Sequence, residues 1–340
     1  MAKKPRFNFM SKKDKPIKIN LNNMILDFLY VKRVERRSRR TVSAYEGSLE
    51  QFAKWYELSG ADGITRDLIR SYIEYLTYEK KRWDDHPTSP TKGAGLSPRT
   101  VNNNIRNLRI FFNHLLSERR ISYSPMEGIN YQREAKDTFD IFTDDDVKLL
   151  LSAPNQKVYS GYRDYCMMLV LCDTGLRVKE LTGIRVRDVE FADRQLYIDA
   201  GNVKTSATRI VPISEETAAA LLKLRQSMNI EDDDYLFLTQ FGERYFGDTF
   251  AKMLKLYAKR VGVTGPRVSP HTFRHYFAVK FLRQGGEPIA LMRILGHSSI
   301  TMTEKYVKYA AVHIKEQHER AKPLAGLIRD SKKGRKVRYK

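Results

Sequence analysis

The sequence predicts a mainly α fold of two domains, with a small antiparallel β-sheet in the second domain. The chain has 340 residues, which is more than one hydrophobic core of ordinary size holds. Apolar residues recur at helical spacing along most of it, and the pattern changes to short strand-like runs only within residues 194–214. Hydrophobic residues make up 41% of the chain, which is enough apolar material to fill folded cores.

The first part of the chain is expected to be a flexible basic arm, residues 1–20, followed by a helical domain, residues 21–122. In this domain Ile25, Phe28 and Leu29 fall on one face of a helix. Residue types that cap helices stand directly before the later apolar runs. The predicted N-caps are Ser38 or Thr41 for one helix, Thr65 for the next, and Ser97 for a third helix that has Pro98 at its first position.

A polar stretch with little periodicity predicts an interdomain linker, residues 123–138, before a second domain, residues 139–325. Thr143 stands before three aspartates, which predicts the first helix start of this domain. The runs RQLYIDA, GNVKTSATR and IVPIS predict short strands. Further helices are predicted at residues 162–173, 215–227, 247–261, 272–284, 287–295 and 300–318, before a basic tail, residues 326–340.

The charge balance points to a polyanionic partner. Lys and Arg number 61 against 40 Asp and Glu, a formal net charge of +21, and such an excess most often serves nucleic-acid binding. A generally basic, soluble surface is the alternative. The sequence has no apolar run long enough to span a membrane and no secretory signal, and Cys166 and Cys172 suit free thiols in a reducing compartment. A cytoplasmic protein without a membrane partner is therefore expected.

Four stretches of the second domain carry residue types that suit chemistry on a phosphate. They are TGLRVKEL with Arg177 and Glu180, NVKTSATR with Lys204, HTFRHYFA with His271, Arg274 and His275, and LGHSSITMTEKYVKY with His297, Tyr306 and Tyr309. Arginine forks grip phosphate oxygens, and lysine and histidine move protons. A tyrosine beside such cations is expected to have a lowered pKa and to attack phosphorus. No cluster of acidic residues accompanies these groups in the sequence, which argues against a two-metal nuclease.

Taken alone, most of these residues also have a structural interpretation, as a helix-end ion pair, a surface lysine, a helix cap or a core aromatic. His271 and His275 are four residues apart on a predicted helix and can bind zinc. However, HTFRH lacks the glutamate of the metalloprotease signature. Only the four stretches together favour a catalytic site.

The four stretches resemble the catalytic domain of the tyrosine recombinases, also called the phage integrase family. TGLRVKEL matches the first arginine motif, VKTSATRIVPI the strand-turn lysine, HTFRH the His-x-x-Arg pair, and LGHSSITMTEKY the final histidine and the nucleophile. The resemblance covers about residues 140–320, and the helical domain before it resembles the family's core-binding domain. It implies a two-domain, C-shaped clamp on duplex DNA.

The resemblance implies a role for each motif residue. Tyr306 attacks the scissile phosphate and forms a 3′-phosphotyrosyl link. Arg177 and Arg274 clamp the phosphate oxygens. Lys204 is the general acid toward the leaving 5′ oxygen, although Lys179 is another basic residue nearby.

His271 and His297 are the remaining catalytic residues in this resemblance, and Glu180 is a supporting residue. His271 and His297 hydrogen-bond the phosphate and assist proton transfer, and Glu180 orients its neighbours. Tyr309 has the wrong offset from His297 for the nucleophile and is expected to be a packing residue. Neither a metal nor another cofactor is implied, because the phosphotyrosyl bond conserves the energy of the broken bond.

The implied partners are double-stranded DNA with specific recombination sites and further copies of the chain, as a homotetramer on two sites joined through the C-terminal segment. Residues that cluster at two helix starts of the first domain are candidates for DNA contact, with a solvated basic face as the alternative. They are Arg39, Arg40, Thr41, Arg99, Thr100, Asn103 and Arg106. The implied activity is site-specific recombination, for integration or excision of a mobile element. The alternatives are an Xer-type dimer resolvase, a type IB topoisomerase or telomere resolvase, and a DNA-binding relative without catalysis.

Overall fold

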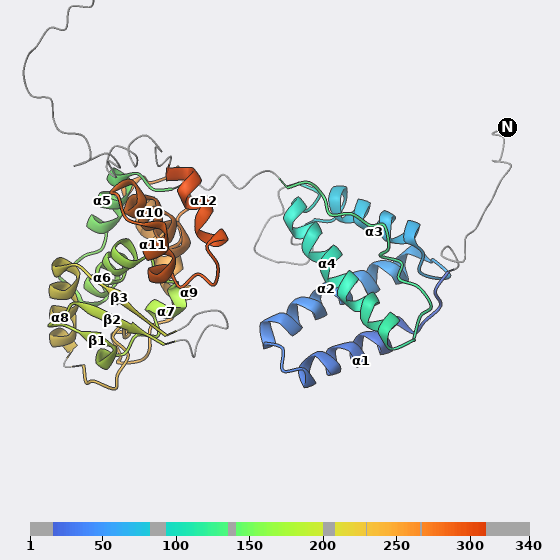
Figure 1. Cartoon of the computed structure of the whole chain (residues 1–340), viewed down its shortest axis with the longest axis horizontal. Helices are drawn as coiled ribbons and strands as arrows, with labels where there is room; N and C mark the ends of the chain where they lie inside the picture. The colour runs from blue at the N-terminus through green and yellow to red at the C-terminus, as the bar shows by residue number, and fades with distance from the viewer. Residues whose placement is uncertain are drawn as a thin grey trace, which may run out of the picture. The chain divides into compact units, whose positions relative to one another are not determined.

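The chain divides into two compact units, Met1–Asp137 and Thr138–Lys340, and both are built mainly of helices (Figure 1). The computed structural model describes residues 16–81, 93–134, 141–199, 208–228, 230–265 and 267–310. Most of the predicted arm, the predicted strand GNVKTSATR up to residue 207, the end of the predicted helix 300–318 and the basic tail lie outside the described residues. Within the described residues, every helix is too short or too polar to span a membrane.

The described part of the first unit is a helical bundle. Its helices are α1 (Leu21–Val34), α2 (Arg39–Ser59), α3 (Arg66–Tyr78) and α4 (Pro98–Ser117). The side chains of Ser38, Thr65 and Ser97 each accept the backbone N–H three residues later, so the predicted helix starts are confirmed. Of the two predicted caps for α2, Ser38 is the N-cap, and the hydroxyl of Thr41 lies 2.7 Å from its Oγ.

Aromatic rings fill the core of this bundle. Phe28 and Phe111 meet edge to face with centroids 5.5 Å apart, and Phe52 meets Tyr72 in the same way at 5.0 Å. All four are fully buried. Edge-to-face pairs of this kind stabilise a core by about 0.5–1.5 kcal/mol beyond the burial of their area.

The segment predicted as a linker, residues 123–138, is packed onto the first unit over its described part. Met126 and Ile129 are buried in the helical core. Arg109 of α4 donates to the carbonyl of Ile129 at 2.5 Å, and Asn102 donates to that of Gln132 at 2.9 Å. The two apolar anchors do not recur at a regular spacing, so the sequence pattern did not reveal their burial.

The second unit is mainly helical with one small sheet, as predicted. Its helices before the sheet are α5 (Asp144–Ser152), α6 (Tyr159–Thr174), α7 (Val178–Leu181) and the 3-10 turn η2 (Val186–Asp188). After the sheet come α8 (Glu215–Met228), α9 (Gly247–Val261), α10 (Pro270–Arg283), α11 (Pro288–Leu295) and α12 (Thr301–Ala310). Thr143 caps α5 through a capping box.

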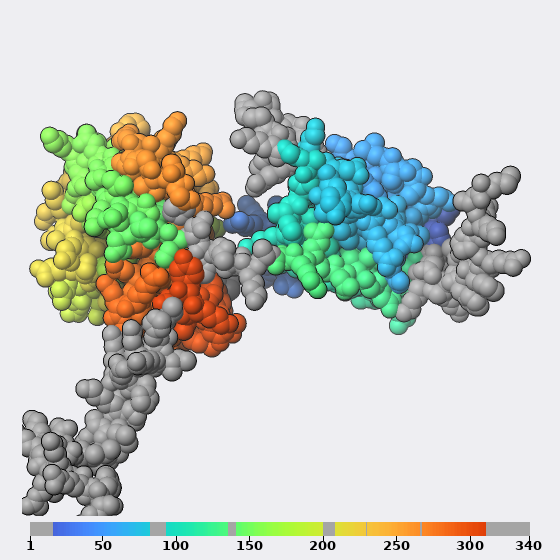
Figure 2. Space-filling model, turned by 90° about the horizontal axis from the view of Figure 1, so that it is seen from above, coloured from blue at the N-terminus to red at the C-terminus, as the bar shows by residue number. Residues whose placement is uncertain are grey.

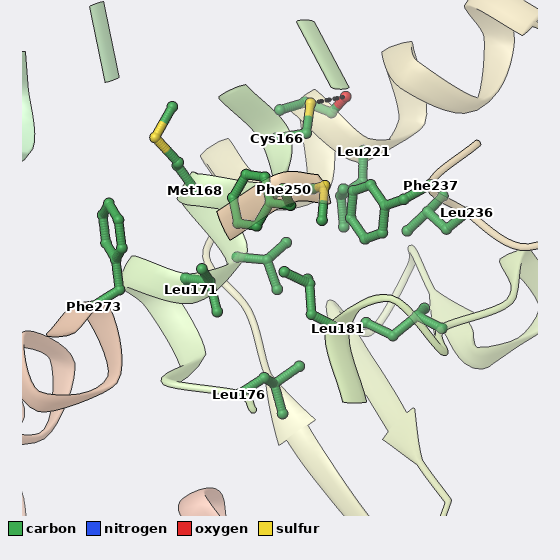
Figure 3. Packing of buried hydrophobic residues seen from close by; sticks show 14 of the residues in the cluster. Cys166, Met168, Leu171, Leu176, Leu181, Leu221, Leu236, Phe237, Phe250 and Phe273 are labelled. Carbon is green, nitrogen blue, oxygen red and sulfur yellow. Dashed lines mark hydrogen bonds between the residues drawn. The ribbon is translucent and has the colours of Figure 1, made fainter. Parts of the chain in front are cut away.

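The sheet of the second unit is antiparallel, with strand order β1-β2-β3. The strands are β1 (Val189–Glu190), β2 (Gln195–Ile198) and β3 (Arg209–Pro212), and Leu196 pairs with Val211. These two side chains face the core, in which Phe250, Leu221 and other apolar residues pack together (Figure 3). The sheet therefore fixes the start of β3, where Arg209 stands, against the core.

The last three helices pack against one another. Helix α10 contacts both α11 and α12, and it also lies against α6. Their orange and red atoms adjoin one another on the surface of the second unit in Figure 2. Because α11 also contacts β3, residues from α6, β3, α10, α11 and α12 come within reach of one another. Cys166 and Cys172 are free thiols, as expected.

Candidate active site

Three arginines from distant parts of the second unit converge on the C-terminal end of α11. Their guanidinium groups donate to three consecutive backbone carbonyls. Arg209 donates to the carbonyl of Ile294 at 2.8 Å, Arg274 to that of Leu295 at 2.9 Å, and Arg177 to that of Gly296 at 3.4 Å. The last carbonyls of a helix have no partner within it and carry partial negative charge. The end of α11 therefore gathers guanidinium groups that would otherwise repel one another.

Gly175 allows this convergence, because it ends α6 in the left-handed conformation with φ +62°. A Cβ at this position would lie 2.5 Å from Phe277 Cδ1 and 2.8 Å from Leu295 Cδ2. Arg274, which is only 5% exposed, donates through Nη1 to the carbonyl of Gly175 at 2.9 Å. The turn that carries Arg177 is thereby held directly beside α10.

Glu180 is buried between two of the arginines, with a side chain only 1% exposed. Its carboxylate accepts hydrogen bonds from Nη1 and the backbone N–H of Arg177, at 3.0 and 2.9 Å. Two further bonds come from Nη1 and Nη2 of Arg209, at 3.2 and 2.9 Å. Burial acts to raise the pKa of Glu180, but the bonds and charges of Arg209 and Arg177 outweigh it, and the pKa is lowered. One carboxylate among three guanidinium groups leaves the cluster positive.

Arg209 was not among the residues predicted for the site. It lies within VKTSATRIVPI, but a single arginine at the start of a strand usually faces solvent. Its side chain is only 9% exposed here. Its partners Glu180 and Ile294 are 29 and 85 residues away in the chain, so no local pattern indicated the contact.

Tyr306, the predicted nucleophile, lies on α12 and is only 1% exposed. Burial raises the pKa of its phenol, and the charges of Arg274 and Arg177 offset only part of this effect. The expectation that the cations would lower this pKa is therefore wrong, because the sequence displays the charges but not the burial. Tyr309 was expected to pack, but it is 37% exposed.

His297 follows Gly296, which ends α11 with φ +64°. Its Nδ1 lies 2.8 Å from Oγ1 of Thr303, a fully buried residue of α12. Its ring is nearly parallel to that of Tyr306, with centroids 6.2 Å apart and an interplanar angle of 8°. Burial, followed by the charge of Arg274, lowers the pKa of His297 to about 3, so this imidazole is neutral at pH 7.

Helix α10 presents two histidines one turn apart. His271 lies in its first turn, behind the N-cap Ser269, and is exposed. Partial shielding from water, followed by the charge of Arg274, lowers the pKa of His271. His275 reaches α12, where its Nδ1 lies 2.8 Å from the hydroxyl oxygen of Tyr306.

His275 was noted in the sequence for a zinc pair with His271 and was not among the predicted catalytic residues. Within the described ranges, no group of three or more His, Cys, Asp or Glu side chains is arranged to hold a metal ion. The ring nitrogen of His275 is instead directed at the hydroxyl of Tyr306. Lys204, the predicted general acid, lies outside the described residues.

The candidate DNA-contacting residues of the first unit lie in the N-terminal halves of α2 and α4. Six of them are exposed: Arg39, Arg40, Arg99, Thr100, Asn103 and Arg106. The seventh, Thr41, is half-buried beside Ser38. Asn107 of α4 donates to the carbonyl of Ala44 at 3.1 Å and to Oγ of Ser48 at 2.9 Å. The N-terminal halves of α2 and α4 are therefore held together, and the positive ends of their dipoles suit phosphate groups.

In the second unit, the tyrosine of α12 lies close to two predicted phosphate-binding arginines and two histidines, and a third histidine lies near the same arginines. Positive groups held in place by backbone carbonyls suit the charge that develops on a phosphate under attack. A hydroxyl beside them suits nucleophilic attack. Comparison with known proteins decides the class. The phage integrase family model matches residues 140–313, and the model for the N-terminal SAM-like domain of phage integrases matches residues 24–121.

The chain belongs to the phage integrase family. The predicted fold class and enzyme class, a tyrosine recombinase, are thereby confirmed. The chain is 30% identical to tyrosine recombinase XerD of Listeria innocua over 323 residues, which cover 90% of this chain and all of that protein. It is 29% identical to XerD of Pseudomonas putida over 310 residues, which cover 89% of this chain and 97% of the relative.

Solved structures of integrases have the same fold. The Tn1549 transposon integrase, in complex with transposon right end DNA, aligns with a TM-score of 0.68 at 20% identity, covering 90% of this chain and all of that one. A λ integrase dimer bound to a core site aligns with a TM-score of 0.66 at 15% identity, covering 85% of this chain and 77% of that one. At these identities the likeness concerns the fold.

Proposed function

We propose that this integrase-family chain is a site-specific DNA recombinase whose nucleophile is Tyr306. The observation that carries the proposal is that Arg177, Arg274, His297 and Tyr306 lie close together, although they come from segments up to 129 residues apart. A structural role for each residue separately does not require this meeting.

In the proposed reaction, Arg177 and Arg274 bind the two non-bridging oxygens of the scissile phosphate, and His271 and His297 donate to the same oxygens. His297 suits this role because Thr303 engages its Nδ1, which leaves Nε2 for the phosphate. Glu180 and Arg209 hold Arg177 in position. Fixed donors of this kind stabilise the developing charge without reorganising during the reaction.

The covalent step exchanges one phosphoester bond for another. The oxygen of Tyr306 bonds to phosphorus, the bond from phosphorus to the 5′ oxygen breaks, and Lys204 supplies the proton that makes a free 5′-hydroxyl. The 5′-hydroxyl of a partner strand then attacks the 3′-phosphotyrosine and restores the DNA backbone. The number of phosphoester bonds is conserved, so neither ATP nor a metal is needed. Because Tyr306 is almost wholly buried, we expect α12 to shift when the phosphate enters.

The proposed substrate is duplex DNA, with the N-terminal halves of α2 and α4 against its phosphates. Recombination needs two DNA sites and an active tyrosine for each strand cut, which suits a homotetramer joined through the C-terminal segment. The place of action would be the nucleoid in the cytoplasm. The biological role would be integration or excision of a mobile element. Dimer resolution is the second candidate, because the chain matches relatives named XerD over their whole length.

The test is a covalent adduct with DNA. Duplexes with a randomised centre and a nick are incubated with the full chain in EDTA, and DNA bound to protein after SDS treatment is sequenced. Wild type and Tyr309→Phe are expected to form the adduct on one recovered sequence, and Tyr306→Phe is expected to lose it. An adduct in Tyr306→Phe would contradict the nucleophile assignment. Adducts without sequence preference, together with relaxation of any supercoiled plasmid, would favour a topoisomerase.

A further inference from the structure

The hydroxyl of the proposed nucleophile Tyr306 has a specific partner, His275, which has no role among the motif residues described above. Nδ1 of His275 lies 2.8 Å from Oη of Tyr306, and the two ring centroids are 5.6 Å apart at an angle of 47°. The residues come from α10 and α12, which pack against each other. His275 directly follows Arg274, so the same turn of α10 carries a phosphate-binding residue and a group that touches the attacking oxygen.

This contact matters because the phenol has to lose a proton as its oxygen bonds to phosphorus. Tyr306 is only 1% exposed, so bulk water is a poor acceptor, and burial raises its pKa. The neighbouring Arg274 and Arg177 stabilise a phenolate, but a guanidinium group has no lone pair with which to accept the proton. An imidazole nitrogen has one.

The two other histidines of the site are less suited to this task. His297 directs its Nδ1 at Thr303, at 2.8 Å, and stacks on the face of the Tyr306 ring with centroids 6.2 Å apart. His271 lies one turn before His275 on α10 and is exposed. Among the described histidines of this unit, His275 is the one with a ring nitrogen within hydrogen-bond distance of the attacking oxygen.

We propose that His275 is the general base for Tyr306, which rests on the proposed function of Tyr306 as the nucleophile. In cleavage, the hydroxyl proton moves to Nδ1 of His275 while the oxygen bonds to phosphorus, and Lys204 protonates the leaving 5′ oxygen. In rejoining, the imidazolium returns its proton to the tyrosine oxygen as that oxygen leaves. His275 therefore starts and ends each cycle neutral, with its other proton on Nε2.

The rival explanation is a resting lock, in which the hydrogen bond only keeps Tyr306 away from DNA. The two explanations predict opposite effects when the contact is removed. Loss of a lock frees the nucleophile and speeds cleavage, whereas loss of a base slows it. General base catalysis contributes typically about 10²–10⁴-fold to a rate.

The experiment measures single-turnover adduct formation on the DNA sequence recovered by covalent capture. The variants are His275→Asn, which keeps an acceptor near the position of Nδ1 without its basicity, and His275→Ala. His114→Asn in the first unit is the matched control, and Lys204→Ala and Tyr306→Phe are references. Each protein is assayed on the natural duplex and on one with sulfur in place of the bridging 5′ oxygen. Because a thiolate leaves without prior protonation, the sulfur duplex bypasses the general acid.

Both His275 variants are expected to slow cleavage at least about 100-fold, with DNA binding and the His114→Asn rate unchanged. The sulfur duplex is expected to restore Lys204→Ala and not His275→Asn. A His275→Asn rate within about threefold of wild type would overturn the proposal, since this is far below the usual effect of a lost base. Faster cleavage by His275→Ala, or rescue of His275→Asn by sulfur, would also overturn it. Absence of any wild-type adduct, or an adduct in Tyr306→Phe, would instead overturn the proposed function itself.

A second measurement on the wild-type chain does not depend on the folding of the His275 variants. In full-length protein labelled with ¹⁵N-histidine, His275 is expected to carry its proton on Nε2, and the resonance of its bare Nδ1 is expected to shift in Tyr306→Phe. A proton on Nδ1 in the wild-type protein would overturn the proposal, because the imidazole would then donate to the tyrosine rather than accept from it.

Discussion

Replacing Glu180 by Gln tests how the arginine cluster is held together. The carboxylate accepts four hydrogen bonds, two from Arg177 and two from Arg209, and its side chain is 1% exposed. An amide keeps one acceptor oxygen and points N–H groups at donors, so about two bonds to charged donors are lost, each of roughly 1.5–3 kcal/mol. The expected loss in the free energy of unfolding is about 3–5 kcal/mol, which is typical of breaking a buried ion pair.

Urea unfolding separates the two units, because both tryptophans, Trp55 and Trp83, lie in the first one. The tryptophan fluorescence transition is expected to be unchanged in Glu180→Gln, while the circular dichroism transition of the second unit moves to lower urea. Glu216→Gln, at an exposed residue of α8, is the matched control.

The stabilisation by the Glu180 carboxylate depends on pH. The pKa of Glu180 is lowered by folding, so its stabilisation is present above its unfolded pKa of about 4.3 and is lost as pH falls through the folded value. The difference between wild type and Glu180→Gln is therefore expected to shrink below about pH 4. A difference under about 0.5 kcal/mol at pH 7, the size of an ordinary surface substitution, would refute the reasoning.

Three further predictions concern a histidine, a glycine and the first unit. The pKa of His297 is lowered to about 3, so the unfolded chain takes up a proton that the folded chain excludes, and stability falls as pH drops from about 6.5 toward the folded value. The urea midpoint is therefore expected to fall less between pH 7 and pH 5 in His297→Gln than in wild type, and equal falls would contradict this. Gly296→Ala adds a Cβ 2.9 Å from Cζ of Arg209 at φ +64°, whereas the Cβ of Gly262→Ala meets nothing within 4 Å at φ +75°. Thermal unfolding is expected to show that both variants lose about 1–2 kcal/mol of the free energy of unfolding through backbone strain. Gly296→Ala alone is expected to lose more than this and to form the adduct more slowly. Arg40→Ala combined with Arg99→Ala is expected to reduce the slope of log K against log salt for DNA binding by about 1.8, or 0.9 per phosphate contact, without changing the melting temperature. Arg70→Ala on α3 is the control. An unaltered slope in the double variant would mean that these two arginines do not contact DNA phosphates.

The helix starts, the period change at the sheet and the fold class could be predicted because they depend on local residue types. Ser38, Thr65 and Ser97 precede apolar runs, and each caps a helix in the structure. The segment with Met126 and Ile129 was predicted to be a linker, because two isolated apolar residues do not show the regular spacing of a helix or a strand. Their burial depends on α4, which comes earlier in the chain.

The motif order predicted which residues share the site, but not how they are arranged. Arg209 was overlooked because its partners are distant in sequence. The direction of the Tyr306 pKa shift was wrong because burial outweighs charge there, and burial is a tertiary property. His275 was visible in HTFRH, but the packing of α12 decides which histidine meets the hydroxyl.

Identifying the residue that carries the DNA tests the central claim most directly. Trypsin cuts after Lys305 and Lys308, so Tyr306 and Tyr309 fall in separate peptides, residues 306–308 and 309–315. After the adduct is trimmed with nuclease and digested, mass spectrometry is expected to find the nucleotide on the peptide 306–308, bound through its 3′ phosphate. A nucleotide on the peptide 309–315, or on any other tyrosine, would contradict the assignment of Tyr306 as the nucleophile.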